Sequence, residues 1–399
     1  MSNASYGGGT MTDSLKVCLD LRSLPEEARR QVEIHYAQTR NKRHEKVGTP
    51  YAKPIAAVSA CSGTGMELTT YWEGSGAKFL QSHIVGDINL PNAVAGQNFE
   101  HGTSVFAAGR AASELLKIWM VDEGVPADAL ASLTTNQVSL HGVTITYLLK
   151  SEFAEQAQAI VKHMESSARI LGLRILRWDS TNETITISGR GFLLTAYCKT
   201  DFSHCTIADP ELRARLQNQA LRIVRIEVYM QGHLLRRKGW STLDSWRHAY
   251  AEGRYAAIFE EMVRGVFKLN VKLRHKAPRR EVMDQMTPTG RAILEAYFGG
   301  TPADALPSIK EGKTADARSK LKSKWRKLIL SKAQIDIAIP WVLHQKLHWL
   351  GLNRALQYPG DHEPVASDAP GCFCKVSWPN WFKHLKKLFQ EAADRQRMG

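Results

Sequence analysis

The stretch that most constrains the fold is 190–199, an apolar run that follows a glycine-flanked arginine and ends in Tyr-Cys-Lys. Side chains alternate between the two faces of an extended chain, so Tyr197 and Lys199 project from one face while Leu194 and Ala196 project from the other. This pattern predicts a strand with an apolar side against a core. A tyrosine beside a lysine on a sheet can attack a phosphate that the cation neutralises. The alternative is an ordinary half-buried strand with one exposed lysine.

The segments around this stretch predict an α+β domain. Apolar runs with strand character alternate with amphipathic, capped segments of helical length, an order typical of a largely antiparallel sheet with helices on one face. We expect strands at 15–21, 55–60, 67–72, 77–83, 137–149, 174–179, 184–188, 192–199 and 221–230, and helices at 25–43, 104–122, 151–171 and 210–220. Beyond residue 239 the pattern becomes helical, with helices expected from 240 and at 256–271, 281–298, 313–332 and 341–350.

Shifts of composition predict the domain boundaries. The glycine-rich opening, 1–10, is interpreted as an added tag or disordered leader. The α+β domain is then expected at 11–239, and a mostly helical, basic domain at 240–357. A stretch rich in Pro, Gly and Asp begins a mobile linker and basic tail at 358–399.

The charge balance favours a polyanionic partner. The chain carries a formal net charge of +14 with a pI near 9.5, so nucleic acid is the first expectation and an acidic membrane surface the second. The alternative is a basic protein whose charge does not serve a polyanionic partner. The six cysteines have neither zinc-finger spacing nor a CxxC pair, and no apolar run reaches the length of a membrane span. We therefore expect a reduced, intracellular protein that does not span a membrane and lacks a phosphate-binding P-loop.

Two segments carry candidate binding residues. Gln81 and His83 lie two positions apart on an expected strand, where both side chains can reach one metal ion. A hydrogen-bonded structural histidine is the alternative. The expected helix 313–332 is strongly basic, and its cluster suits contacts to DNA phosphates, although it could also be a solvated charged face. The predicted DNA-binding residues are Lys320, Lys324, Arg326, Lys327 and, near the tyrosine strand, Arg190.

Five separated stretches resemble the gene II/X family of filamentous-phage and plasmid replication initiators. Residues 77–83 read A-K-F-L-Q-S-H, similar to the family's A-K-x-L-Q-G-H-N, and 196–199 read A-Y-C-K, similar to A-Y-x-K. Residues 225–227 read R-I-E, similar to R-x-E. The stretches 335–340 and 378–382 resemble the C-terminal motifs of the family more loosely. The resemblance extends in order over residues 70–385 and implies an HUH-endonuclease-like fold.

Members of that family nick one DNA strand at an origin and start rolling-circle replication. The resemblance implies that Tyr197 is the nucleophile, forming a 5′-phosphotyrosine link and a free 3′ hydroxyl primer, and that the strand is later rejoined. Lys199 would offset phosphate charge. Mg²⁺ or Mn²⁺ would be held by Gln81, His83 and Glu227 and would stabilise the departing oxygen.

The chain departs from the family pattern in ways that affect this ligand set. Ser82 stands in place of the usual Gly, Ile84 in place of Asn, and Thr144 in place of the family's acid. His141 and Glu227 are the candidates to replace that acid. Tyr229, two residues from Glu227, is the rival nucleophile.

The implied partners are origin DNA that is single-stranded or locally melted, and a host helicase and polymerase in the cytoplasm of a bacterium. Two other classes of function stay open at this point. One is a non-cleaving origin-binding repressor or copy-control protein, and the other is an RNA-binding α+β protein.

Overall fold

The structure is a computed structural model, and its contacts divide the chain into two units. The first contains 1–157, 190–256 and 359–399, and the second contains 158–189 and 257–358. The boundary predicted at 239 thus falls inside the first unit, because Tyr255 is anchored there: its hydroxyl accepts from the Val105 N–H, and its carbonyl accepts from Tyr147. The structure describes residues 9–35, 44, 47, 50–63, 65–73, 80–95, 103–131, 133–179, 184–198, 210–269, 279–312, 314–338, 341, 352–360 and 378–398.

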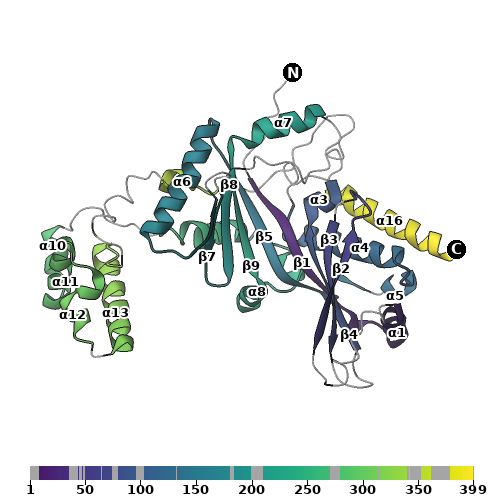
Figure 1. Ribbon diagram of the computed structural model, residues 1–399, viewed down its shortest axis with the longest axis horizontal. Helices are drawn as coiled ribbons and strands as arrows, with labels where there is room; N and C mark the ends of the chain where they lie inside the picture. The colour runs from purple at the N-terminus through teal and green to yellow at the C-terminus, as the bar shows by residue number, and fades with distance from the viewer. Residues whose placement is uncertain are drawn as a thin grey trace. The chain divides into compact units, whose positions relative to one another are not determined.

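A nine-stranded sheet organises the fold (Figure 1). Its order is β2-β3-β4-β1-β5-β9-β8-β7-β6, and the strand pairs for which a register is described are antiparallel. The strands are β1 Gly9–Asp20, β2 Tyr51–Val58, β3 Gly65–Glu73, β4 Leu80–Asn89, β5 Val138–Lys150, β6 Ile175–Asp179, β7 Thr184–Ser188, β8 Phe192–Cys198 and β9 Ile223–Gln231.

The two faces of the central strands differ in character. One face is apolar and fully buried, with Leu15, Ile145 and Ile226 all at 0% exposure. Helix α4 (Val105–Asp122) packs against β1, β4 and β5 on this side. Gly86 allows the close approach, because a Cβ there would lie 2.9 Å from the Leu116 side chain. The opposite face carries polar and charged side chains of the same strands, since side chains alternate along each strand.

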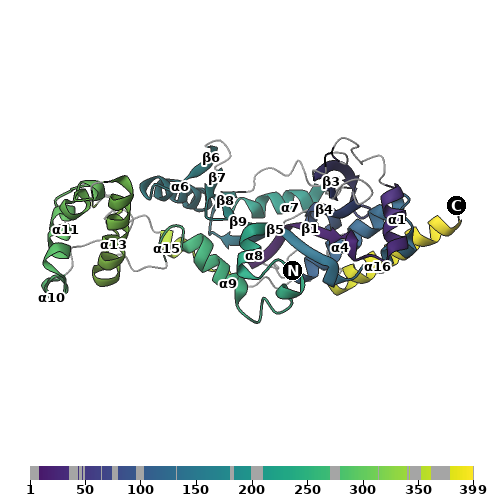
Figure 2. The same cartoon turned by 90° about the horizontal axis from the view of Figure 1, so that it is seen from below.

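The other helices of the first unit are short, apart from the C-terminal one. They are α1 Glu26–His35, α3 Leu90–Ala95, α5 Ala127–Ala131, α7 Pro210–Ala220, α8 Gly232–Lys238, α9 Arg254–Ile258 and α16 Trp378–Met398, with single turns η1 Leu21–Ser23, η4 Thr135–Gln137 and η5 Asp244–Trp246. Helix α16 lies along α4 (Figure 2). Arg395 pairs with Asp122 at 3.0 Å, and the Gln396 side chain accepts from the Ala127 N–H at 3.0 Å. The described part of the predicted basic tail is therefore a docked helix.

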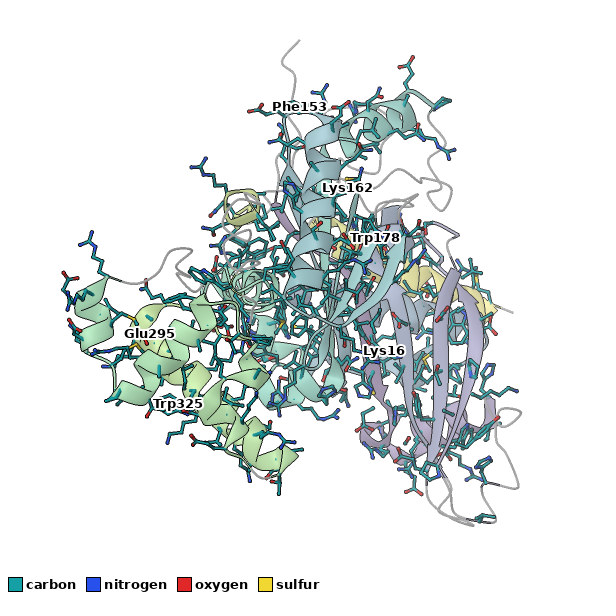
Figure 3. The ribbon with its side chains drawn as sticks, turned by 60° about the vertical axis from the view of Figure 1, so that its left-hand side comes forward. Lys16, Phe153, Lys162, Trp178, Glu295 and Trp325 are labelled. Carbon is teal, nitrogen blue, oxygen red and sulfur yellow. The ribbon has the colours of Figure 1, made fainter. Side chains whose placement is uncertain are left out.

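The second unit contains β6, β7, most of α6 (Ala154–Ile170) and a group of helices with its own core. The helices are α10 Arg280–Asp284, α11 Pro288–Phe298, α12 Pro307–Lys310, α13 Ala315–Ala333 and α15 Leu352–Ala355, with η6 Phe259–Arg264 and η7 Ala303–Ala305. Ile293, Leu294 and Ile329, all at 0% exposure, form the centre of that core. Glu295 on α11 and Trp325 on α13 are marked in Figure 3.

The predicted α+β class and antiparallel sheet are confirmed. Helix α4 begins after the Ser104 N-cap, as its sequence indicates, and α7 has the predicted bounds. The leader predicted at 1–10 ends earlier than expected, because Gly9 and Thr10 already belong to β1 and pair with Leu148 and Tyr147 of β5. The predicted helix 341–350 lies almost wholly outside the described residues. Within the described part of the chain, no helix is long and apolar enough to cross a membrane.

Candidate functional site

The first polar site joins the two strands that the sequence motifs mark. Tyr197 on β8 lies opposite Arg225 on β9, and Thr195 lies opposite Glu227. Tyr197 and Glu227 are therefore diagonal neighbours on one face of the sheet. The Tyr197 hydroxyl donates a hydrogen bond to Glu227 Oε1 at 2.7 Å, and both side chains are half-buried. As predicted, Leu194 and Ala196 point into the core behind them.

Arg225 lies beneath this pair and is the most buried charge of the site. Its side chain is 1% exposed; Nε donates to Glu227 Oε1 at 2.8 Å, and an Nη2 lies 2.7 Å from Asp13 Oδ1. Asp13 reaches it from β1 through a β-bulge. The register shifts there, since Thr12 pairs with Ile145 and Ser14 with Thr144. A bulge adds a residue and redirects a side chain. We call Tyr197, Glu227, Arg225 and Asp13 the tyrosine network.

Burial governs the titration of this network. Burial raises the Tyr197 pKa well above its usual value, although Arg225 opposes the shift. Burial also raises the Glu227 pKa, and again Arg225 pulls it back. The phenol is therefore a protonated donor near neutral pH, and Glu227 is a more basic carboxylate than an exposed one. Glu227 is the only oxygen acceptor that the described contacts assign to the Tyr197 hydroxyl, so proton transfer from tyrosine to this carboxylate is the chemistry the geometry provides.

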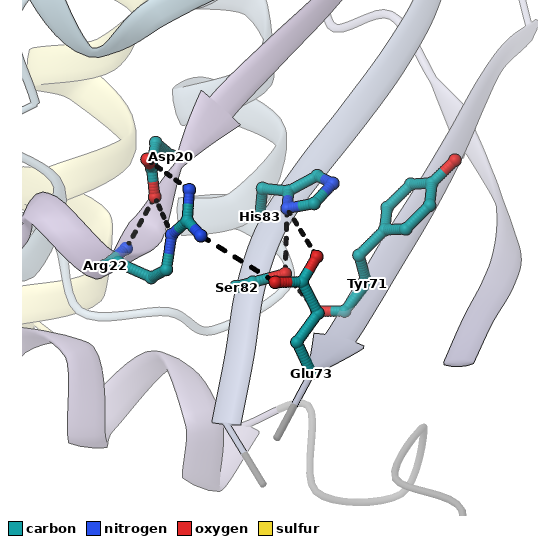
Figure 4. A network of polar contacts seen from close by, with 6 residues as sticks. All are labelled: Asp20, Arg22, Tyr71, Glu73, Ser82 and His83. Carbon is teal, nitrogen blue, oxygen red and sulfur yellow. Dashed lines mark hydrogen bonds and ion pairs between the residues drawn. The ribbon is translucent and has the colours of Figure 1, made fainter. Parts of the chain in front are cut away.

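His83 belongs to a second polar cluster at another place on the sheet (Figure 4). Ser82 Oγ lies 2.8 Å from its Nδ1, and the Tyr71 ring stacks on the imidazole at 4.4 Å between centroids. Glu73 approaches Nδ1 at 3.9 Å and also faces Arg22, which Asp20 holds with two side-chain hydrogen bonds.

His141 on β5 lies close to this cluster. Its ring centroid is 6.1 Å from that of His83, with the rings edge to face. Burial lowers the pKa of both histidines. Nearby charge is the second cause: Glu73 raises the pKa of His83, whereas His83 lowers the pKa of His141. Both imidazoles are therefore neutral at pH 7, which leaves ring nitrogens able to accept a hydrogen bond or a metal ion.

The two polar sites lie far apart, so the predicted metal ligands do not converge. His83 pairs with Asp20 on β1, whereas Glu227 pairs with Thr146, which pairs with Met11 on β1. His141, whose ring is 6.1 Å from that of His83, lies five residues from Thr146 along β5, or about 17 Å at about 3.3 Å per residue. Glu227 is in addition occupied by Tyr197 and Arg225.

The predicted ligand set of Gln81, His83 and Glu227 is therefore corrected, and it does not fit one Mg²⁺ or Mn²⁺ ion. Gln81 pairs with Trp72 in the β3–β4 ladder, and its side chain lies outside the described residues. Among the described residues, no group of three or more His, Cys, Asp or Glu side chains could hold a metal ion.

Of the other residues predicted to lie near the tyrosine, only Arg190 is described. Lys199 lies outside the described residues. Arg190 is exposed and precedes β8, seven residues from Tyr197, which is about 23 Å along an extended chain. It is followed by Gly191, whose φ of +89° favours glycine.

The basic helix α13 presents a stripe of lysines. Lys320, Lys324 and Lys327, here called the α13 lysines, are exposed at i, i+4 and i+7 and so share one face. Lys320 also pairs with Asp316 at 2.7 Å, a fully solvated contact. Arg326, which was also predicted to bind DNA, is held by a carboxylate of its own unit. Its guanidinium makes two hydrogen bonds, of 2.7 and 2.8 Å, to the carboxylate of Asp336, which is 0% exposed.

Sequence reasoning missed two members of the tyrosine network. The R-x-E spacing was a usable signal for Arg225, because alternate residues of a strand share a face and Glu227 was already a candidate. Asp13 offered no such signal, because its position depends on the bulge in β1. The chain matches no protein-family model, and neither the curated proteins nor the solved structures contain a significant match to it.

Proposed function

We propose that this chain is a DNA strand-cleaving replication initiator in which Tyr197 attacks a phosphodiester, with an HUH-endonuclease-like sheet as its scaffold. The observation that supports this most is the 2.7 Å hydrogen bond from the Tyr197 hydroxyl to Glu227. A tyrosine is a weak nucleophile until a base removes its proton, and a carboxylate of raised pKa within hydrogen-bond reach is such a base.

The reaction balances through these two side chains. Glu227 accepts the Tyr197 proton as the phenolic oxygen forms a bond to phosphorus. The bond from phosphorus to the 3′ oxygen breaks, and that oxygen leaves with its electron pair and takes a proton back from Glu227. The products are a 5′-phosphotyrosine link and a free 3′ hydroxyl, which can prime a polymerase. Rejoining is the same sequence in reverse.

Arg225 and Asp13 position the base. The buried guanidinium donates to the Glu227 oxygen that also accepts from Tyr197, so it holds that oxygen toward the phenol. Asp13 contacts a second nitrogen of the guanidinium, Nη2, and offsets its charge. Because the predicted metal ligands do not converge on Tyr197, no step of this mechanism passes through Mg²⁺ or Mn²⁺.

The α13 lysines are the proposed contact to origin duplex. Their spacing places three ammonium groups on one exposed helix face, interleaved with Ser319 and Ser323, which suits a phosphate backbone. Host helicase and polymerase would then act on the nicked strand.

A non-cleaving DNA-binding protein is the second candidate, and one observation favours it. The Tyr197 hydroxyl is already satisfied by a half-buried carboxylate, and such a network can simply specify a sheet register.

The decisive experiment is detection of a covalent adduct with a labelled origin-type oligonucleotide on a denaturing gel. The parent protein should form the adduct on the peptide containing Tyr197. Tyr197→Phe should abolish it, and Glu227→Gln, which keeps a hydrogen-bond acceptor but not a base, should slow it by about 10²- to 10⁴-fold.

Tyr229→Phe is the matched control, because Tyr229 is also half-buried on β9. It should leave the adduct intact. An adduct that survives Tyr197→Phe and maps to Tyr229 would reject the assignment of the nucleophile. Absence of any adduct, with retained duplex binding, would favour the non-cleaving candidate.

A further inference from the structure

The segment that follows β9 contains aromatic and basic residues that the proposed cleavage does not use. Helix α8 leads into Trp240 and a loop that is fastened to β5. Leu140 N–H donates to the Ser241 carbonyl at 2.7 Å, and Ser139 forms a bridge with Thr242. Apolar burial of Leu234 and Leu235 holds α8 itself. This segment is therefore a fixed part of the first unit.

Trp240 is a half-buried ring surrounded by cations. Arg254 lies 5.2 Å and Lys238 lies 5.6 Å from its ring. The fully buried Trp246 meets it edge to face at 5.6 Å, and Trp246 Nε1 donates to the Trp240 carbonyl at 2.8 Å. Because Trp246 fixes the backbone of Trp240, the partly exposed ring is held in one position.

The end of α8 adds positive charge beside this ring. Its last turn reads Arg236, Arg237 and Lys238. Arg236 and Arg237 are exposed, and neither makes an ion pair with another described residue. Three cations at a helix C-terminus interact favourably with the helix dipole. That effect alone does not require a tryptophan next to them, and a helix of seven residues has a small dipole.

Other basic residues of the loop are used structurally. Arg247 pairs with Asp244 and stacks over Phe106 at 4.7 Å. Arg254 is bound to Glu252 and to the Ser245 carbonyl. The charge left for a ligand is thus concentrated at the end of α8, next to Trp240.

We propose that Trp240, Arg236 and Arg237 form a binding site for single-stranded nucleic acid, with a base stacked on the Trp240 ring and the neighbouring phosphates held by the two arginines. Proteins that bind single strands without strong sequence preference combine a positive surface with aromatic rings on which bases stack. A paired base has both faces covered by its neighbours, so the site selects an unpaired one. The site does not depend on Tyr197 chemistry.

The start of α8, the helix whose last turn carries the two arginines, lies against His141. A Cβ added at Gly232, the first residue of α8, would lie 2.9 Å from the His141 carbonyl oxygen. A strand bound at Trp240 would therefore be anchored at the His141 end of β5, away from Tyr197, and would give the protein a second hold on unpaired DNA.

The test is equilibrium binding of the full chain to fluorescein-labelled oligothymidine and oligouridine, followed by anisotropy over a range of salt concentrations. Arg236→Gln with Arg237→Gln should weaken binding and lower the slope of log K against log salt by about 1.4, at about 0.7 per lost phosphate contact. Trp240→Leu should weaken binding roughly tenfold, as expected for one lost base stack, and Trp240→Phe should restore most of it. If the variants lose the same affinity for oligothymidine and for oligouridine, the site binds phosphates and bases and accepts either sugar.

The control removes the same charge elsewhere in the first unit. Arg30 and Lys53 are exposed, and Arg30→Gln with Lys53→Gln should leave the salt slope within about 0.3 of the parent. The proposal is overturned if the α8 double variant behaves like this control, or if Trp240→Leu melts like the parent and binds with parental affinity. Adduct formation at saturating oligonucleotide should survive the α8 double variant. A missing adduct in every protein would count against Tyr197 chemistry and leave the binding result valid.

Discussion

Replacing Arg225 with methionine should be among the most damaging changes in the first unit. The guanidinium is 1% exposed and contacts Glu227 at 2.8 Å and Asp13 at 2.7 Å, whose side chains are 22% and 7% exposed. Removing one partner of a buried ion pair leaves the other charge without compensation, at a cost of about 3–5 kcal/mol. Arg225→Met leaves two such carboxylates, so we expect about 4 kcal/mol of lost stability at pH 8.

The loss should shrink on acidification. Burial already raises the pKa of Glu227 above its ordinary value of 4.5, and Arg225 limits that rise. Without Arg225 the folded-state pKa rises further. The folded variant then keeps a proton that the unfolded chain has released, so its stability falls as pH rises from about 4.5 through the folded pKa. The difference between variant and parent should therefore be smaller at pH 5 than at pH 8.

Urea unfolding followed by circular dichroism and tryptophan fluorescence at both pH values measures this difference. Arg247→Met is the control, because Arg247 and Asp244 have side chains 50% and 62% exposed, and such a surface pair contributes about 0–1 kcal/mol. A variant of Arg225 within 1 kcal/mol of the parent at both pH values would refute the buried network, as would a loss that grows on acidification.

Three further outcomes follow from the separated sites and from the second unit. His83→Ala should leave the Tyr197 adduct at the parental rate, since His141, beside His83, is five residues along β5 from the row of Glu227; loss of the adduct would mean that the histidine cluster takes part in cleavage. Changing the three α13 lysines to glutamine should lower the salt slope of duplex binding by roughly one unit per lost contact, measured by filter binding, without affecting cleavage of a single-stranded oligonucleotide. Burial would raise the Asp336 pKa, but hydrogen bonds from Arg326 and Lys268 lower it to about 2. Its contribution, about 2 kcal/mol, should therefore be present above pH 4 and lost as the pH falls toward 2, and Asp336→Asn should remove that acid dependence in urea unfolding.

The local elements of this fold could be predicted from the sequence, whereas the meeting of distant residues could not. Alternation along 192–198 placed Leu194 and Ala196 in the core and Tyr197 on the other face, because strand periodicity is a local property. The helix expected at 104–122 is α4, because amphipathic periodicity is equally local, and Ser104 is its N-cap.

The candidate metal site failed because it depended on register. Gln81 and His83 share a strand, but the row in which Glu227 lies is decided by pairings through β5 and β1, and β1 has a bulge that no local pattern announces. A one-residue shift of register exchanges the faces of a strand, so distances across several strands cannot be read from spacing. Arg225 could have been placed beside Glu227, since that relation lies within one strand.

The position of β1 has a consequence for how the chain is made. It is synthesised before both of its neighbours in the sheet, β4 and β5, which end at Asn89 and Lys150. Pairings of such long sequence separation form slowly, and unpaired strand edges are prone to aggregation while they wait. The surface of α4 that receives α16 stays uncovered longer still, until residues 378–398 have been synthesised. Ribosome-bound chains stopped before α16 should therefore expose an apolar strip of α4 to chaperones, and release of the last segment should end that exposure.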